Sequence, residues 1–332
     1  MGKPLITGID IGHYSIKAVV LKPASDDYSI VSFKELPISG DVFSDNHTVN
    51  HQQIVNKLKE LRKFLPIWSK RVAIAIPDNA VISKLLQIDS DLDERETEFA
   101  IYQGFSHQSP FPIEELRLDF VRVDNDSKTP TAAYQVYATK KEVVDSRYHS
   151  VKKAGFSPLV CDVQAHGLVS VWRQAAKKTA HPDWLLVDVG YTQTSLCMDF
   201  DNKAHFSKEI ALGTQYMDQD PSSMGSLLEQ KTDQFNQLMI DRIQRQIQML
   251  LSVNGDSSVK GIWLSGGGAT TPMLVEEIQR RLCIECQVLN PLALLGRSRT
   301  RKPHHYSDLH GFNTAVGIAM RGHDWLEVQH AL

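Results

Sequence analysis

The hydrophobic pattern of the first 80 residues predicts a β-sheet interrupted by one helix. Apolar and polar residues alternate over 5–21, which predicts a β-hairpin that turns at 12–15, and a third strand follows over 28–36. Isoleucine and leucine residues three or four positions apart then give a helix over 51–65 a single apolar face. The apolar run 72–77, which ends in proline, is typical of a short buried strand.

The pattern changes after residue 80. Strands over 81–88, 118–123 and 132–139, together with helices over 93–105 and 141–154, predict a small α+β unit. Because longer α/β segments stand on both sides of it, we interpret this unit as a subdomain inserted into a larger fold.

The rest of the chain alternates strands and helices. A strand over 159–163 leads into a helix that ends near residue 180, a long helix covers 233–251, and a small-residue helix covers 311–322. We therefore expect a two-domain α/β fold with an inserted subdomain. Its predicted parts are a first domain over 1–80, completed by 155–180 and 312–332, an insert over 81–154, and a second domain over 181–311.

Two similar turns stand about 180 residues apart. Asp10 and Gly12 follow one apolar strand, Asp188 and Gly190 follow another, and each turn precedes a second β-type run. The pair predicts two related hairpins that face one ligand across a cleft. A nucleoside triphosphate with Mg2+ fits this chemistry, because glycines let backbone amides approach phosphate oxygens and carboxylates hold a hydrated hard cation.

A glycine-rich turn favours the same ligand. The apolar strand that ends at Ser265 precedes Gly266, Gly267 and Gly268, and a helix opens shortly afterwards. A strand, glycine turn and helix N-terminus present free amides and a positive dipole end to an anion or a nucleotide ring. A tight structural turn is the alternative that this motif leaves open.

Composition narrows the class of protein. The 332 residues are 42% hydrophobic and 23% charged, as in globular proteins, and a formal charge of −3 with no basic stripe argues against nucleic-acid binding. The first residues lack a secretory signal, and no apolar run approaches the roughly eighteen residues of a membrane span. We therefore expect a cytoplasmic protein.

The four cysteines suit a reducing compartment. Cys283 and Cys286 match a Cys-x-x-Cys pair, which together with His304, His305 and His310 suggests a zinc site or a redox pair. The alternative is buried cysteine, which the predicted change from helix to strand at this position favours.

The order of the motifs resembles the five nucleotide motifs of the superfamily of actin, sugar kinases and heat-shock chaperones. It runs from the hairpin at Asp10 through the strand end at 162–165 and the hairpin at Asp188 to the glycine turn and the small-residue helix. The position of the insert is similar to that in the bacterial division protein FtsA and in the PilM family of type IV pilus assembly, and segments 75–81 and 111–116 are more similar to PilM. The resemblance implies an actin-like, ribonuclease H-like ATPase fold.

The resemblance also implies roles for the cleft residues. Asp10 and Asp188 would hold Mg2+ through water, and Lys17 would reach the phosphates of ATP. Gln164 falls where the superfamily places a residue that positions water, which makes it the candidate catalytic residue. The phosphate motifs contain no other candidate base or water-positioning residue, so turnover is expected to be slow. The phosphate loops and the adenosine-facing turn would consist of Gly12, His13, Tyr14 and Ser15, of Gly190, Thr192 and Thr194, and of Gly266, Gly267 and Gly268.

The implied function is an ATP-binding scaffold for pilus biogenesis and twitching motility. Its partner would be the N-terminal cytoplasmic peptide of the membrane protein PilN, held between the first domain and the insert. Val81, Leu85, Phe111 and Pro112 are the candidates for this contact, unless they only fill the core of the insert. The protein would lie at the inner membrane through its partners rather than by direct membrane contact, and the pilus assembly ATPase and self-association are further contacts that the resemblance suggests.

Three alternatives remain open. The MSHA pilus and type II secretion use similar components. An actin fold without nucleotide binding is favoured by residues 213–230, which depart from the family where purine contacts are expected and leave Glu229 and Lys231 as substitutes. A small-molecule kinase would need Asp162 as the base, although the insert lacks a polar sugar pocket.

Overall fold

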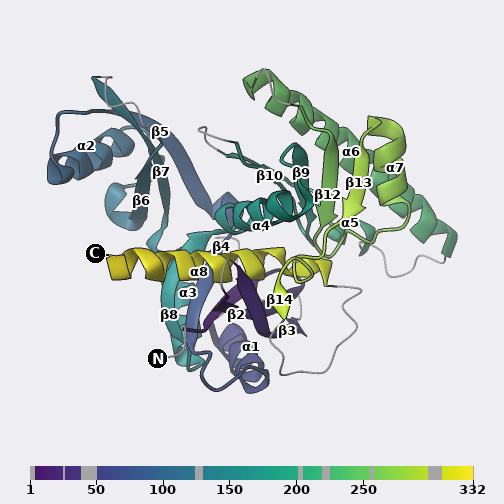
Figure 1. The fold of residues 1–332 in the computed structure, drawn as a ribbon, viewed down its shortest axis with the longest axis horizontal. Helices are drawn as coiled ribbons and strands as arrows, with labels where there is room; N and C mark the ends of the chain where they lie inside the picture. Colours follow the sequence, from purple (N-terminus) through teal and green to yellow (C-terminus); the bar gives the residue numbers. More distant parts are fainter. Residues whose placement is uncertain are drawn as a thin grey trace.

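The computed structural model describes residues 4–24, 27–38, 51–123, 130–200, 205–218, 225–254, 258–297 and 309–331. These residues form three sheets with helices around and between them (Figure 1). Among them, no helix combines the length and the apolar character that crossing a membrane requires.

The first sheet has six strands in the order β14-β3-β2-β1-β4-β8. β1 and β2 pair antiparallel and form the predicted first hairpin, whereas β4 and β8 run parallel to β1. Helices α1 (His51–Phe64) and α3 (Lys141–Lys153) cover one face, where Ile54 and Val151 share a core with Ile9. The strands are β1 (Ile6–Ile11), β2 (Ser15–Pro23), β3 (Tyr28–Pro37), β4 (Arg71–Ile76), β8 (Ser157–Val163) and β14 (Gly296–Arg297).

Two helices pack closely on the other face of this sheet. A Cβ atom on Gly8 of β1 would lie 2.0 Å from the carbonyl oxygen of Ala315 in α8 (Asn313–Ala331), so glycine lets α8 approach the strand. α8 also crosses α4 (Gln164–Thr179), where a Cβ atom on Gly317 would lie 1.9 Å from the carbonyl oxygen of Gly167. The small residues of α8 therefore let the two helices meet between the two larger sheets (Figure 1).

The second sheet has five strands in the order β11-β10-β9-β12-β13. α4 shares its core, because the indole of Trp172 donates a 2.7 Å hydrogen bond to the carbonyl of Trp184 and lies edge-on to Trp263. Its elements are β9 (Trp184–Val189), β10 (Thr194–Met198), β11 (Phe206–Ile210), α5 (Gln215–Asp218), α6 (Gly225–Asn254), β12 (Gly261–Ser265), α7 (Leu274–Leu282) and β13 (Glu285–Val288).

The third sheet, in the order β5-β7-β6, belongs to the predicted insert. Its strands are β5 (Val81–Asp89), β6 (Leu116–Arg122) and β7 (Thr131–Lys140), and α2 (Glu94–Ser106) covers one face. The N-terminus of α2 is fixed by a capping box, in which the Asp93 carboxylate accepts from the Glu96 amide and the Glu96 carboxylate accepts from the Asp93 amide.

Three elements differ from the sequence predictions. α6 begins at Gly225 rather than near residue 233, because its first turns lack the apolar stripe by which we located the helix. α8 continues to Ala331, because only its first half needs small residues and Leu326 still packs on the first sheet. α3 contacts β7 but packs mainly against α1 and β8. The domain borders stay a prediction, and α3, which lies within the predicted insert, packs mainly on elements of the predicted first domain.

Candidate functional site

The two Asp-x-Gly hairpins have the same turn geometry. The amide of Gly12 donates to the carbonyl of Ser15 at 3.1 Å, and the amide of Gly190 donates to the carbonyl of Gln193 at 2.9 Å. The two turns contact one another, since the hydroxyl of Thr192 lies 3.3 Å from Nδ1 of His13. Two hairpins far apart in the sequence therefore meet at one site.

Behind these turns lies a cleft of about 650 Å³. Its wall contains Gln164, at the start of α4, and Pro77, directly after β4, as well as both turns and the glycine-rich loop. Twelve residues that the sequence predicts for nucleotide binding, metal binding or catalysis line it: Asp10, Gly12, His13, Tyr14, Ser15, Lys17, Gln164, Asp188, Gly190, Thr192, Gly266 and Gly267.

Two predicted residues, Thr194 and Gly268, do not line the cleft. Thr194 is buried, and its hydroxyl donates a 2.8 Å hydrogen bond to the carbonyl of Leu212. Gly268 instead packs behind the loop, where a Cβ atom would lie 2.4 Å from Cγ1 of Val189. Both residues support the loops from behind.

The cleft concentrates negative charge at two carboxylates. Burial raises the pKa of Asp10 to about 6, with the Lys17 ammonium lowering it and the Asp188 carboxylate raising it. Burial also raises the pKa of Asp188, although Ser265 and Asn313 each donate a 2.9 Å hydrogen bond to its Oδ1. A cation between the two side chains would stabilise their ionised forms.

Lys17 is held inside the cleft by its neighbours. Its Nζ donates a 2.8 Å hydrogen bond to Oγ of Ser15 and lies 3.4 Å from Oε1 of Glu35. The Ser15 hydroxyl in turn donates to the same Glu35 oxygen at 2.6 Å. This lysine therefore has a fixed position beside the first turn, unlike a solvated lysine on a strand.

Arg147 also lines the cleft, and sequence reasoning missed it. It lies on α3 with 1% of its surface exposed, and its Nη1 donates to the carbonyl of Val143 at 3.1 Å. Burial lowers its pKa to about 10, while the negative charges of an ionised Cys161 and of the Asp10 carboxylate act in the opposite direction. The one signal in the sequence is its spacing of four residues from Val143 and Val151, which places a charge on the buried face of the helix.

The end of the cleft near the glycine-rich loop has a mixed lining. Thr214 and Met217 approach from the segment that includes α5, and Thr271 and Pro272 approach from the turn before α7. Glu229 and Lys231, which we considered as purine contacts, lie on α6 and do not line the cleft. Residues 219–224 of the divergent segment lie outside the described residues.

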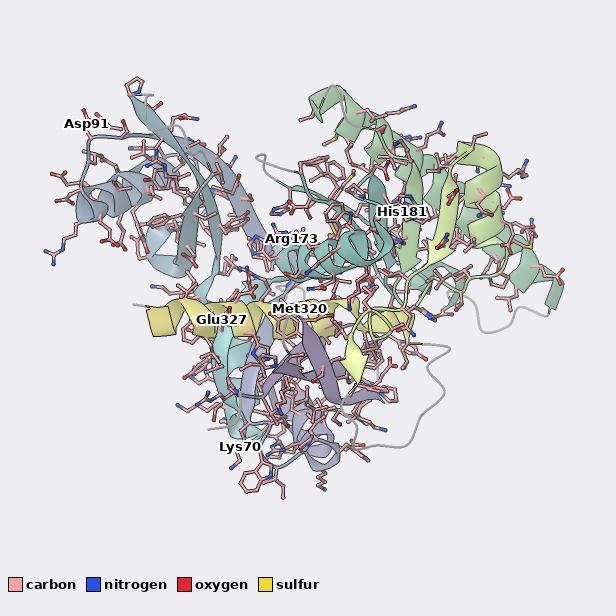
Figure 2. All side chains as sticks on the ribbon, in the orientation of Figure 1. Lys70, Asp91, Arg173, His181, Met320 and Glu327 are labelled. Atoms are coloured by element: carbon pink, nitrogen blue, oxygen red, sulfur yellow. The ribbon has the colours of Figure 1, made fainter. Side chains whose placement is uncertain are left out.

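A second cavity, of about 700 Å³, lies between the third sheet, β8 and α8, and we call it the groove. Apolar side chains from all three sides line it, and charged side chains such as Arg117, Arg173 and Asp119 surround them. In Figure 2, Arg173 labels α4, and Met320 and Glu327 label α8, which are the two helices beside the groove. The apolar lining includes Val81, Val121, Tyr137, Val160, Trp325 and Val328.

Three of the four predicted partner-binding residues do not line the groove. Val81 does. Leu85 lies further along the same strand and is largely exposed, Pro112 lies before β6, and the ring of Phe111 lies 4.3 Å from the Lys140 ammonium. The four residues stay a prediction for partner binding, and the groove itself is lined by residues of β6, β7, β8, α4 and α8.

Asp162 lies in the groove rather than in the cleft. Burial raises its pKa, but hydrogen bonds from His166 Nδ1 and Arg321 Nε, both 2.7 Å long, outweigh that effect and bring the pKa to about 2. A carboxylate held in this way is a poor proton acceptor. The kinase hypothesis therefore loses its candidate base.

The Cys-x-x-Cys pair is divided between two environments. Cys286 is buried in β13, whereas Cys283 is exposed at the end of α7. Within the described ranges, no three histidine, cysteine, aspartate or glutamate side chains come together to hold a metal. His304 and His305 lie outside the described residues.

Two α/β halves around a cleft, each presenting an Asp-x-Gly hairpin, define an actin-like fold. A family model described as "Type IV pilus assembly protein PilM" matches residues 8–230 and 225–323. The chain therefore belongs to this family of actin-like proteins of type IV pilus assembly.

Solved structures agree with this fold. The chain is similar to one in a PilM-PilN type IV pilus biogenesis complex, with 20% identity, a TM-score of 0.79, and coverage of 96% of this chain and 98% of the other. It is also similar to the ethanolamine utilization protein EutJ from Carboxydothermus hydrogenoformans, at 16% identity, TM-score 0.51 and coverage of 96% and 90%. A nucleotide-free diol dehydratase-reactivating factor matches at 9% identity, TM-score 0.55 and coverage of 97% and 100%.

Proposed function

We propose that the chain is a nucleotide-responsive scaffold that binds ATP with Mg2+ in the cleft and the N-terminal cytoplasmic tail of PilN in the groove. A similar chain has been solved in a PilM-PilN complex, which supports PilN as the partner. Through that partner the chain would lie at the inner membrane and serve pilus biogenesis.

The cleft has the chemistry that an ATP-magnesium complex needs. Asp10 and Asp188 offer two closely placed carboxylates to a hydrated hard cation, which would neutralise charge on bound phosphates. Lys17 lies beside the first turn, and the glycines of both turns leave the backbone open to phosphate oxygens. These residues fit the ligand, so the divergence over 213–230 does not remove the phosphate-binding part of the site.

Catalysis is the weaker part of the site. Gln164 lines the cleft and can orient water through its amide, but an amide cannot accept the proton that an attacking water must lose. We therefore propose slow hydrolysis at most, with binding rather than turnover as the main activity.

The groove suits an extended peptide. Its apolar strip would take alternate side chains of the tail, and the charged residues around it would fix the register. β5 and β6 are the outer strands of the third sheet, so a tail in the groove also has an unpaired strand edge within reach.

The observation that carries the proposal is the wall between the two cavities. At the end of β4, Ile76 lines the groove and the next residue, Pro77, lines the cleft. At the end of β8, Val163 lines the groove and Gln164 lines the cleft. One residue along each strand separates the two sites, so a movement caused by one ligand changes the surface offered to the other.

A chain of polar contacts runs beside this wall. The side chain of Asn79, just before β5, donates a 3.0 Å hydrogen bond to Oε1 of Gln193 in the second turn. Gln193 donates in turn to Oε2 of Glu209 at 2.6 Å. The second phosphate loop is thereby connected to the strand that begins the insert.

Calorimetry tests the proposal. Purified protein is titrated with ATP and Mg2+, and then with a synthetic PilN tail peptide in the presence and absence of the nucleotide. Micromolar ATP binding that Asp10→Ala and Asp188→Ala abolish, with a peptide affinity that changes severalfold with ATP, is the expected result. Peptide binding without any nucleotide binding would leave only an interaction module.

A further inference from the structure

The end of α1 and the loop between α1 and β4 expose three large apolar side chains. Trp68 is 83% exposed, Ile67 is 69% exposed and Phe64, at the end of α1, is 49% exposed. We call these three residues the apolar tip. They lie on the outside of the first sheet, away from both the cleft and the groove, and neither cavity includes them.

Hydrogen bonds hold the loop between α1 and β4 in one backbone conformation. Arg62 donates from Nη1 to the carbonyl of Pro66 at 3.0 Å and from Nη2 to the carbonyl of Ile67 at 2.6 Å. The hydroxyl of Ser69 donates to the same Pro66 carbonyl at 2.7 Å, and Leu65 is buried as the anchor of the loop. The hydrogen bonds fix the backbone, so the exposure of the apolar tip is a property of an ordered loop.

Positive charge surrounds the apolar tip. Residues 57–71 contain six lysine or arginine side chains and one acidic side chain, Glu60, which pairs with Lys57 at 3.2 Å. The exposed members Lys59, Lys63, Lys70 and Arg71 form no ion pair with any described residue. Lys70 marks the lower end of the molecule in Figure 2.

Two neighbouring segments extend the positive surface. The Lys34 ammonium lies 4.5 Å from the centre of the Phe64 ring. The amide of Ser157 donates to the carbonyl of Lys70 at 2.7 Å, which brings the last turn of α3, with exposed Lys152 and Lys153, to the same end of the sheet. The chain as a whole carries a net charge of −3, so this basic end stands out from the rest of the protein.

We propose that the apolar tip and the lysines around it form a docking surface for a bilayer that contains anionic phospholipid. Tryptophan and isoleucine on a convex loop can enter the interface between headgroups and acyl chains, where amphipathic rings are favoured. Lysine and arginine side chains around such a tip are attracted to anionic headgroups. This inference differs from the indirect membrane contact expected from the sequence, and it does not depend on nucleotide or PilN binding.

Vesicle flotation of the full chain tests the inference. The probes are vesicles with 30% phosphatidylglycerol in phosphatidylcholine, and vesicles of pure phosphatidylcholine. We expect the wild type to float with the anionic vesicles only, and less so as the salt concentration rises. The charge variant Lys63→Glu/Lys70→Glu should lose about tenfold or more in vesicle affinity, since each lysine near the surface contributes about fivefold. Ile67→Ser/Trp68→Ser should lose about tenfold or more through its apolar area.

The matched control makes the same kinds of change on an exposed face of the insert. Arg95→Glu/Phe99→Ser on α2 replaces one exposed cation and one aromatic side chain that is 70% exposed, and it should float like the wild type. Circular dichroism melting curves check that all variants are folded. Brominated lipid should quench the tryptophan fluorescence of Trp68→Phe less than that of the wild type, because the inference places the Trp68 indole at the boundary between headgroups and acyl chains.

Three results would overturn the inference. The first is a wild type that does not float with anionic vesicles. The second is that the tip variants float as well as the control. In the third, the tip variants keep vesicle binding but lose a dimer that light scattering detects in the wild type, which would assign the patch to self-association.

Discussion

The carboxylate of Asp78 accepts a 2.8 Å hydrogen bond from the backbone amide of Ala165. Asp78 follows β4 and Ala165 lies in the first turn of α4, whose preceding residue Val163 offers no side-chain cap. The bond therefore caps α4 from a distant segment. It lies between the cleft and the groove, because the two residues before Asp78 and the two residues before Ala165 each include one that lines the groove and one that lines the cleft. The wall between the two sites depends on this contact.

Asp78→Ala should lower the free energy of unfolding by about 1–2 kcal/mol, as the loss of a helix cap does. Urea denaturation measures the change. Asp78→Asn is the matched control, because its amide oxygen can still accept from Ala165 and the substitution removes a carboxylate whose pKa burial raises to about 6. Equal destabilisation by both substitutions would contradict the role assigned to the hydrogen bond.

Gly317→Ala should destabilise the fold by about 3 kcal/mol or more, because the new Cβ atom would lie 1.9 Å from a backbone oxygen that cannot move aside. Gly104→Ala in α2 is the control, since its Cβ atom would meet only Cδ1 of Leu86 at 3.5 Å. The control should gain about 0.5–1 kcal/mol from helix propensity. Thermal melts measure both variants. A lower melting temperature for Gly317→Ala and a higher one for Gly104→Ala would confirm the close crossing of α4 and α8, and equal changes would refute it.

Local patterns predicted the hairpins and the glycine-rich loop. Asp10 and Asp188 each follow an apolar strand and precede glycine, and this information lies within a few neighbouring residues. The supporting contacts were not predictable in the same way. Ser265 and Asn313 reach Asp188 from segments 77 and 125 residues away, and nothing near either residue marks that meeting.

Contacts between distant segments also explain why neither Arg147 nor the groove was predicted. Arg147 enters the cleft because α3 packs against the first sheet, and the sequence pattern assigned that helix to the insert. The groove is lined by residues of the third sheet, β8, α4 and α8, which lie far apart in the sequence, so no local pattern predicted it. Sequence periodicity tells which face of an element is apolar, but not which neighbour that face meets.

Asp10→Asn should have opposite effects on the stability of the free protein and on its nucleotide binding. The folded protein binds a proton at Asp10 more tightly than the unfolded chain, with a pKa of about 6 against 3.8, so the ionised carboxylate costs stability that is regained as the pH falls from about 6 to about 4. At pH 7.5 the free energy of unfolding of the variant should therefore be about 1 kcal/mol higher than that of the ligand-free wild type. This value is smaller than the pKa difference alone would give, because Asp10 is partly exposed in the cleft and solvent screens its charge. The variant should also lose binding of ATP with Mg2+.

The same group sets the pH dependence of binding. Affinity of the wild type for ATP with Mg2+ should fall by up to about tenfold per pH unit below 6, because a proton competes with the cation for the carboxylate. Calorimetry at pH 7.5, 6.5 and 5.5 measures this, with stability followed in parallel by urea denaturation. An Asp10→Asn protein that is less stable at pH 7.5 and still binds the nucleotide would exclude Asp10 from the metal site.

Val121→Glu should weaken binding of the PilN tail peptide by about tenfold or more. Val121 lies on β6, lines the apolar strip of the groove and is 52% exposed, so the substitution places a charge under the docked peptide without disturbing the core. Burying that charge against an apolar side chain costs at least the 1.4 kcal/mol that corresponds to tenfold. Phe111→Ser is the control, because the Phe111 ring lies against Lys140 and does not line the groove. Fluorescence polarisation with a labelled peptide gives both affinities, and ATP titration checks that the cleft is unchanged. If Phe111→Ser weakens the peptide as much as Val121→Glu does, the tail binds along the turn before β6, and the groove is not its site.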